Sequence, residues 1–264
     1  MATRDENLAR LHRLPRDAWE EELRARSALP GPRANLELLG ALASAVEPTD
    51  EGRLRAWAAL PADQADGNDP GTFVAVCGLV GLGALAGLSG AEPARRAGLV
   101  AELRTRAPDP RWRVREAVAI ALQHLGAADP VALLVVARSW AEDPDPFIRR
   151  ALVAALAEPP LLVHPALAAE LVAILGRVTA DLSATPRAAR RSPGTIALEK
   201  TLGYAWSVAI VAEPAGGWPA FEGLVAAAAD DPDLRRIARA NLGKRRLARL
   251  DPVRTTALAA RLSG

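Results

Sequence analysis

The residue types that most often carry catalysis or bind metals are sparse and scattered in this chain. Its three histidines, His12, His124 and His164, lie far apart in sequence, and none has a carboxylate or cysteine at ligand spacing. Cys77 is the single cysteine, so it has no partner for an internal disulfide or a CxxC site. We therefore predict no metal site, no cofactor and no serine–histidine–aspartate triad, and we expect Cys77 to be a small buried side chain.

Basic side chains are the remaining candidates for chemistry. Residues 231–264 carry nine basic side chains against three acidic ones, whereas the whole chain has a formal net charge of only +2. A surface that meets several phosphates gains affinity from counterion release, and arginine can bond phosphate through two N–H groups at once. The candidate partner-binding residues are Arg113, Arg150, Arg187, Arg190, Arg191, Lys200, Trp206, Arg236, Lys244, Arg245 and Arg246.

Two simpler interpretations of the basic residues stay open. The whole chain is rich in arginine, alanine and glycine, which makes its solvated faces basic without any ligand. A cation near a helix C-terminus also stabilises the helix macrodipole, and residues 244–246 fit that role. These three residues are still the better contact candidates in the basic tail.

A repeated phrase shows which elements would position these side chains. The phrase consists of Asp-Pro, a short spacer, an apolar residue, an arginine and an alanine-rich run. It occurs three times, beginning at Asp109, Asp145 and Asp231. Asp caps helices and Pro suits the first helical turn, so each phrase predicts a helix start. The apolar residue recurs after 34 residues, from Val114 to Ile148, and then after about twice 43, a period typical of two-helix repeats.

The rest of the chain also predicts helices. Hydrophobic residues make up 50% of it and aromatic residues only 4%, a composition that favours close helix packing over sheets. The uncharged, glycine-rich segment 70–91 is expected to be a buried helix, with membrane insertion as the weaker alternative. A basic loop with Pro186 and Pro193 is expected near 184–194. We expect helices near residues 5–27, 35–46, 70–91, 93–106, 112–125, 130–141, 146–157, 165–180, 195–212, 218–229, 233–243 and 252–262.

The repeated phrase resembles the start of the second helix of HEAT repeats, over roughly residues 94–262. This resemblance implies an all-α, right-handed α-solenoid of roughly six helix pairs. Residues 1–264 would form one domain, with N-terminal helices in 1–92 and HEAT-like repeats in 93–264. Runs that begin at Trp140, Lys200 and Ala240 are also similar in order to the HEAT-like DNA alkylation repair proteins, which are alkylpurine DNA glycosylases.

The resemblance to the repair family implies a concave, positively charged surface that holds duplex DNA by its backbone, with aromatic residues and a carboxylate near a damaged base. The pattern expected there is adjacent tryptophans followed by a nearby Asp. Residues 72–90 contain neither tryptophan nor an acid. The nearest substitutes are Trp140 with Asp143 and Trp206 with Glu199. Neither pair has the spacing of the family pattern, so we assign no catalytic residue from the resemblance.

The resemblance also supplies structural roles for several conspicuous residues. In HEAT arrays the arginine of the phrase bonds the Asp and the carbonyl groups of an adjacent repeat, so Arg115, Arg149 and Arg235 are expected to serve stacking. The six tryptophans are spread about one per repeat, and core packing is their expected role. Trp112 and Trp206 are the two that would otherwise face the groove and stack on a base or a peptide.

These observations lead to two functional hypotheses. The first is a non-catalytic HEAT-repeat scaffold that holds a protein or duplex DNA along its concave face. The alternative is a DNA-binding repair protein of the alkylpurine DNA glycosylase type. The charged start of the chain lacks a secretory signal and the lone cysteine suits a reducing compartment, so we expect a cytoplasmic protein that does not use a membrane. The sequence leaves the oligomeric state open.

Overall fold

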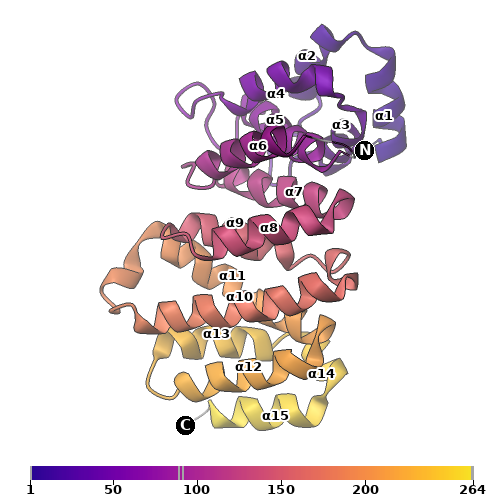
Figure 1. Cartoon of the computed structure of the whole chain (residues 1–264). Helices are drawn as coiled ribbons and strands as arrows, with labels where there is room; N and C mark the ends of the chain where they lie inside the picture. The colour runs from indigo at the N-terminus through magenta and orange to yellow at the C-terminus, as the bar shows by residue number, and fades with distance from the viewer. Residues whose placement is uncertain (1, 89, 91, 263–264) are drawn as a thin grey trace. The chain divides into compact units, whose positions relative to one another are not determined.

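A computed structural model describes residues 2–88, 90 and 92–262 of the chain. All of the secondary structure in these residues is helical, which confirms the all-α prediction (Figure 1). The contacts between Cα atoms divide the chain into two compact units, residues 1–132 and 133–264. The prediction of one continuous array over 1–264 stays a prediction.

The N-terminal unit is built around one buried helix, α5. This helix packs against α4 and α7 most extensively, and also against α2, α3 and α6. The helix expected over 5–27 is in fact broken at Pro15, after which a single 3-10 turn leads into α2. The elements of this unit are α1 (Arg4–Arg13), η1 (Arg16–Ala18), α2 (Trp19–Ala25), α3 (Leu36–Ala45), η2 (Pro48–Asp50), α4 (Glu51–Ala58), α5 (Pro70–Gly87), α6 (Pro93–Arg106) and α7 (Trp112–Ala128).

The glycines of α5 let neighbouring backbones approach it closely. A Cβ atom on Gly78 would lie 2.5 Å from the backbone nitrogen of Ala58, and one on Gly83 would lie 2.5 Å from the Cα of Ala121. Among the described residues α5 is the one helix long and apolar enough to cross a bilayer, but 89% of it is buried inside the protein, as in core helices. The prediction of a buried helix in this segment is confirmed.

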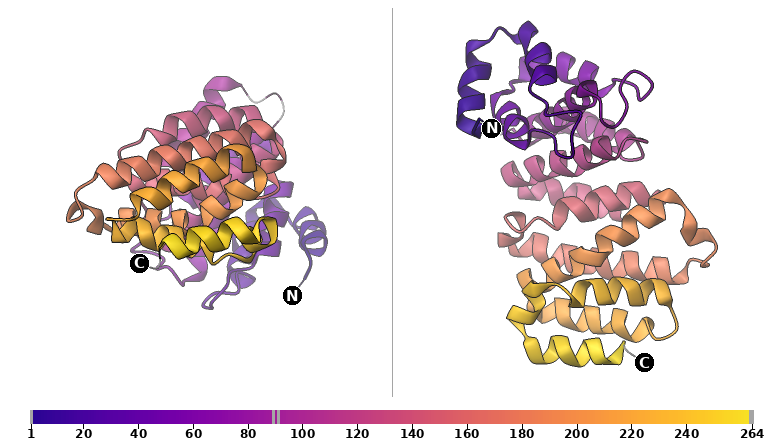
Figure 2. Two further views of the ribbon diagram at one scale, coloured as in Figure 1. Left: turned by 90° about the horizontal axis from the view of Figure 1, so that it is seen from below. Right: turned by 180° about the vertical axis from the view of Figure 1, so that it is seen from behind.

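The C-terminal unit contains a row of three helices, α9, α11 and α13, of which α9 and α13 carry the repeated phrase. In this row α11 packs against both α9 and α13, while α10 and α12 pack against each other and against α11. The orange and yellow helices of this unit run alongside one another in Figure 2. The elements are α8 (Pro130–Ala141), which crosses the unit boundary, α9 (Pro146–Leu156), η3 (Leu161–Val163), α10 (Pro165–Ala184), η4 (Ala189–Arg191), α11 (Pro193–Ala212), α12 (Pro214–Ala227), α13 (Pro232–Leu242), α14 (Arg245–Leu250) and α15 (Pro252–Arg261).

Many helix starts follow the rule that the sequence suggested. Asp145 caps α9 by accepting a hydrogen bond from the N–H of Phe147 at 2.8 Å, and Asp231 caps α13 by accepting from two backbone N–H groups. Each is followed by proline at the first helical position, where the missing N–H costs nothing. The phrase therefore does start helices at these two places.

The copy of the phrase that begins at Asp109 differs from the other two, because its Asp is not the residue that caps the helix. Helix α7 begins at Trp112, as expected for the helix over 112–125, but Asp109 is not its N-cap. The Asp109 carboxylate instead accepts hydrogen bonds from the backbone N–H and the guanidinium of Arg111. Asp143 occupies the matching position before α9, where it accepts from the N–H of Asp145 at 2.9 Å. The counterpart of Asp109 is thus Asp143, not Asp145. The two were confused because Asp143-Pro144 is followed directly by a second Asp-Pro, at 145–146.

The arginines of the phrase make the same local contact in all three copies. Arg115 donates to the carbonyl of Asp109 at 2.7 Å, Arg149 to that of Asp143 at 2.5 Å, and Arg235 to that of Ala229. In each case the carbonyl lies six residues upstream, so the arginine closes the loop before its own helix. Arg149 also reaches a neighbouring helix, where it pairs with Asp181 of α10 at 2.8 Å.

Candidate functional site

Several of the candidate basic residues are bound within the protein. Arg113 is buried and donates to the carbonyls of Gly67 at 2.9 Å and Gly31 at 2.7 Å. Arg190 is 3% exposed and donates to the carbonyl of Thr185 at 2.7 Å. These guanidinium groups anchor loops of their own units, and neither is presented to a partner.

The basic segment 184–194 is largely exposed, as expected, but it is anchored to the rest of the unit. It contains the 3-10 turn η4, and Arg190 from this turn pairs with Asp231, the cap of α13, at 2.6 Å. Hydrogen bonds from Arg190 and from the N–H groups of Leu234 and Asp233 outweigh the effect of burial, so the pKa of Asp231 falls below its ordinary value. The segment is therefore fastened to α13.

Five of the six tryptophans are buried in the core. Trp206 is completely buried; its Nε1 donates to the Thr179 hydroxyl at 3.2 Å and its ring lies 5.8 Å from that of Phe221. Its ring therefore has no exposed face on which a base could stack. Trp112 is the exception, because 52% of it is exposed and the Arg113 guanidinium lies 4.4 Å from its ring centre.

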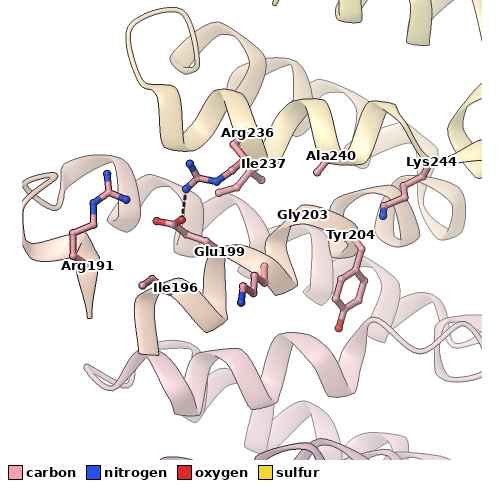
Figure 3. A pocket seen from close by; sticks show the side chains of 10 residues that line it. Arg191, Ile196, Glu199, Gly203, Tyr204, Arg236, Ile237, Ala240 and Lys244 are labelled. Carbon is pink, nitrogen blue, oxygen red and sulfur yellow. Dashed lines mark hydrogen bonds and ion pairs between the residues drawn. The ribbon is translucent and has the colours of Figure 1, made fainter. Parts of the chain in front are cut away.

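Four of the candidate cations do come together, in a pocket between α11 and α13 (Figure 3). The pocket has a volume of about 520 Å³ and lies entirely within the C-terminal unit. Its charged and aromatic residues come from η4, α11, α13 and the start of α14. The lining residues are Arg191, Ile196, Glu199, Lys200, Gly203, Tyr204, Arg236, Ile237, Ala240 and Lys244.

The spacing of the lining residues follows from helix geometry. On α11 the pocket residues run from Ile196 through Glu199, Lys200 and Gly203 to Tyr204, which is the spacing of one helical face. The Ser192 hydroxyl fixes the start of this helix by accepting from the N–H of Thr195 at 3.2 Å. Helix α11 thus supplies a carboxylate, an ammonium group and a phenol side by side.

Asn241 fixes α13 against α11 close to the pocket. Its side-chain N–H₂ group donates to the carbonyl of Leu202 at 2.8 Å, and its Oδ1 accepts from the N–H of Ser207 at 2.9 Å. Asn241 is fully buried, so these contacts to two backbone groups of α11 are shielded from water. The two walls of the pocket are therefore held in one register.

Two buried carboxylates organise the cations. Asp233 is 1% exposed and lies within 4 Å of four guanidinium groups, with Arg236 closest at 3.0 Å. Glu199 is 6% exposed; its Oε2 accepts from Arg236, and Figure 3 shows this contact as a dashed line. Burial opposes the charge of Arg236, but hydrogen bonds to Glu199 and Asp233 raise the pKa of Arg236 above its ordinary value.

Glu199 keeps one unsatisfied oxygen. Among the described residues, no hydrogen-bond donor meets its buried Oε1 atom. Leaving a buried acceptor unpaired costs about 1–3 kcal/mol, more for a charged group. Glu199 lines the pocket, so a ligand that brings a donor to this oxygen would gain affinity from the new hydrogen bond.

No protein-family model matches this chain, and no curated protein matches its sequence.

The function of the pocket therefore has to be argued from its own residues, of which the two lysines are the most informative. Lys200 and Lys244 are the only lysines in a chain with 33 basic lysine and arginine residues, and both line this pocket. Within the part of the chain that the structure describes, neither ammonium group has a hydrogen-bond or ion-pair partner. Both positions were candidates, but their convergence follows only from the packing of α14 and α13 against α11.

The arrangement is chemically suited to bind anions. Four cationic side chains and one carboxylate line the cavity, and none of the lining residues is a histidine, cysteine or serine. No group of His, Cys, Asp or Glu in the described residues could hold a metal ion. The remaining candidates lie elsewhere: Arg187 approaches Asp233 at 3.8 Å, Arg245 and Arg246 are exposed on α14, and Arg150 belongs to α9.

The site residues that sequence reasoning missed are Tyr204 as a lining side chain, Glu199 as the buried carboxylate and Asn241 as the brace. Glu199 and Lys200 are adjacent in sequence, yet Glu199 is buried and Lys200 exposed, a difference that no local pattern encodes. The one signal available was the restriction of lysine to two positions in an arginine-rich chain.

Proposed function

We propose that this chain is a non-catalytic helical-repeat scaffold of the HEAT type, and that its C-terminal unit holds an anionic partner in the pocket between α11 and α13. The observation that carries this proposal is the convergence of both lysines of the chain on one cavity, where their ammonium groups have no partner within the protein. Unpaired cations in a concave site gain most from a negatively charged ligand.

The repeat part of the proposal is supported by local geometry. Three loops, before α7, α9 and α13, are closed by an arginine that donates to the carbonyl six residues upstream. In the C-terminal unit α9, α11 and α13 pack in succession, and α10 and α12 lie against them. Equivalent loops followed by equivalent helices are what a right-handed solenoid of helix pairs would require.

The repair alternative has less support from the site. A glycosylase that excises alkylpurines would need aromatic rings and a carboxylate together in an open groove. Trp206 and Trp140 are buried, at 0% and 3% exposure, and Asp143 is 7% exposed and holds the loop before α9. Glu199 is paired with Arg236. Binding without catalysis therefore accounts for more of the observed contacts.

The proposal predicts that the two lysines carry the affinity for anions. Fluorescence anisotropy would measure the binding of labelled polyphosphate, duplex DNA and a phosphorylated peptide to the wild type and to a Lys200→Ala/Lys244→Ala variant, at low and high salt. At least one probe should bind the wild type at low salt, and the variant should bind it about 100-fold more weakly, since each charge-assisted contact contributes roughly tenfold.

The matched control is Arg138→Ala on α8, which removes a cation that is 70% exposed and pairs with Glu170 far along the chain from the pocket residues. It should bind like the wild type. If no anionic probe binds at low salt, or if the lysine variant binds as tightly as the control, the proposal is wrong. Release of a base from methylated DNA would instead support the repair alternative.

A further inference from the structure

The pocket combines two features that a simple anion would not satisfy together. The unpaired ammonium groups of Lys200 and Lys244 attract negative charge, whereas the carboxylate of Glu199 repels it. The Oε1 atom of Glu199 is buried and lacks a donor, although its Oε2 atom is bonded to Arg236. A ligand complementary to all of these groups carries an anion and, beside it, an N–H donor.

We infer that the pocket recognises a phosphorylated side chain on an extended segment of a partner protein. The phosphate binds Lys200 and Lys244, with Arg191 at the rim, and a backbone N–H next to the phosphorylated residue donates to Glu199 Oε1. The inference rests on the proposed function, because it names the partner that the same pocket binds. It adds the chemistry of that partner and the role of Glu199.

The charge of the pocket favours a phosphate ester over a carboxylate side chain. A phosphorylated residue carries a charge of about −1.5 to −2 at neutral pH and offers three acceptor oxygens, so it can bond several cations at once. An aspartate or glutamate offers one charge. Arg191 and Arg236 are each more than half exposed at the side chain, which leaves N–H groups of these residues toward solvent in addition to their contacts with Asp233.

The shape of the pocket favours a peptide over a nucleic acid strand. The cations line one cavity of about 520 Å³, a size typical of sites for small groups. A strand needs cations spaced along its backbone, but the arginines of the repeated phrase, Arg149 and Arg235, are bonded to their own loops. Ile196, Ile237 and Ala240 add apolar surface suited to the side chain that neighbours a phosphorylated residue.

The experiment compares wild type and Glu199→Gln by titration calorimetry with four probes. These are the capped tripeptide acetyl-Ala-phosphoserine-Ala-amide, the same peptide without phosphate, and inorganic phosphate, with a short oligothymidylate as the nucleic acid arm. In the variant, the Gln oxygen stays with Arg236 because Arg236 can only donate, so the Gln N–H₂ occupies the Oε1 position. The N–H₂ group of the variant side chain and the backbone N–H of the peptide are then both donors, so the hydrogen bond between them is lost.

We expect the phosphopeptide to bind wild type more tightly than inorganic phosphate does, and the unphosphorylated peptide not to bind. Glu199→Gln should weaken phosphopeptide binding about tenfold, the loss expected for one hydrogen bond to a charged group, and should leave inorganic phosphate binding unchanged or tighter because a negative charge is removed. Thermal unfolding of the variant checks that it folds, and Arg138→Ala is again the control.

The outcomes separate the inference from the proposed function. If oligothymidylate binds through the lysines more tightly than the phosphopeptide, or if only inorganic phosphate binds, the scaffold proposal stands and the inference is wrong. The inference is also wrong if Glu199→Gln weakens phosphopeptide and inorganic phosphate by the same factor, because Glu199 would then act only in positioning Arg236. If none of the probes binds, both fail.

Discussion

At the scale of single residues, the arginines and lysines of this chain have different structural roles. The arginines fasten loops: Arg113, Arg115 and Arg190 each bond backbone carbonyls with a fork of N–H groups, a task that suits the planar guanidinium. The lysines do not take part in such contacts and lie in the pocket. Residue type alone predicted a basic surface, but which cations are bound internally depends on carbonyl groups that only the fold brings near.

Trp206 shows the same limit of sequence reasoning. Its place on an apolar helix allowed either a core role or a groove role, and the deciding contacts, Thr179 and Phe221, come from two other helices. The default interpretation of tryptophans as core residues holds for five of them and fails for Trp112, which is 52% exposed. The exposed side of a helix cannot be read from its own residues when both faces are apolar.

Asp231 gives a prediction about stability and pH. Burial alone would raise the pKa of this carboxyl, but hydrogen bonds from Arg190, Leu234 and Asp233 lower it below its ordinary value of 3.8. A carboxyl whose pKa is lower in the folded state stabilises the fold above its ordinary pKa, and this stability is lost as the pH falls through the folded value. The wild type should therefore lose this contribution below about pH 4.

The measurement is the free energy of unfolding in urea at a series of pH values. Asp231→Asn should lower it by about 2 kcal/mol at neutral pH, because the buried Arg190 loses its closer carboxylate, at 2.6 Å, and keeps only Asp233, at 3.5 Å; it should also reduce the fall below pH 4. Asp230→Asn, at the exposed neighbouring position, should behave like wild type. A variant of Asp231 with unchanged stability and an unchanged acid slope would contradict this account.

At the scale of elements, proline marked the helix starts well. The starts of α6, α8 and α9 lie where they were expected, at Pro93, Pro130 and Pro146, because proline fixes the first turn. Interruptions were predicted less well. Pro15 splits the first helix, and α14 was not anticipated, because its six residues offer too short an apolar pattern.

The glycines of α5 test how closely this core is packed. Gly83→Ala places a Cβ against the backbone of Ala121, which cannot shift without moving α7, so we expect a loss of about 1–3 kcal/mol in the free energy of unfolding. Gly176→Ala is the matched change on α10, where nothing lies within 4 Å, and should gain up to about 1 kcal/mol from helix propensity. Urea unfolding of both variants measures this, and equal effects would show that α5 does not pack as described.

At the scale of the whole molecule, the balance of charge confines anion binding to a local site. The chain has 33 basic and 31 acidic residues, and many of the arginines are paired within their own unit. A nearly neutral protein gains little from long-range attraction, so binding must come from the few unpaired cations. The all-helical fold could be predicted from the sequence, whereas the convergence of η4, α11, α13 and α14 on one pocket could not, because it depends on long-range packing.

The most direct test of the central claim uses the two lysines as reporters. Reductive methylation with isotope-labelled formaldehyde keeps their positive charge and gives NMR signals from Lys200, Lys244 and the amino terminus only, since the chain has no other lysine. Lysine-to-arginine variants assign the two signals. On titration with inorganic phosphate, we predict that both lysine signals shift and saturate together while the amino-terminal signal stays in place. If the lysine signals do not move, or if all the signals drift without saturating, the pocket does not bind anions and the proposed function is contradicted.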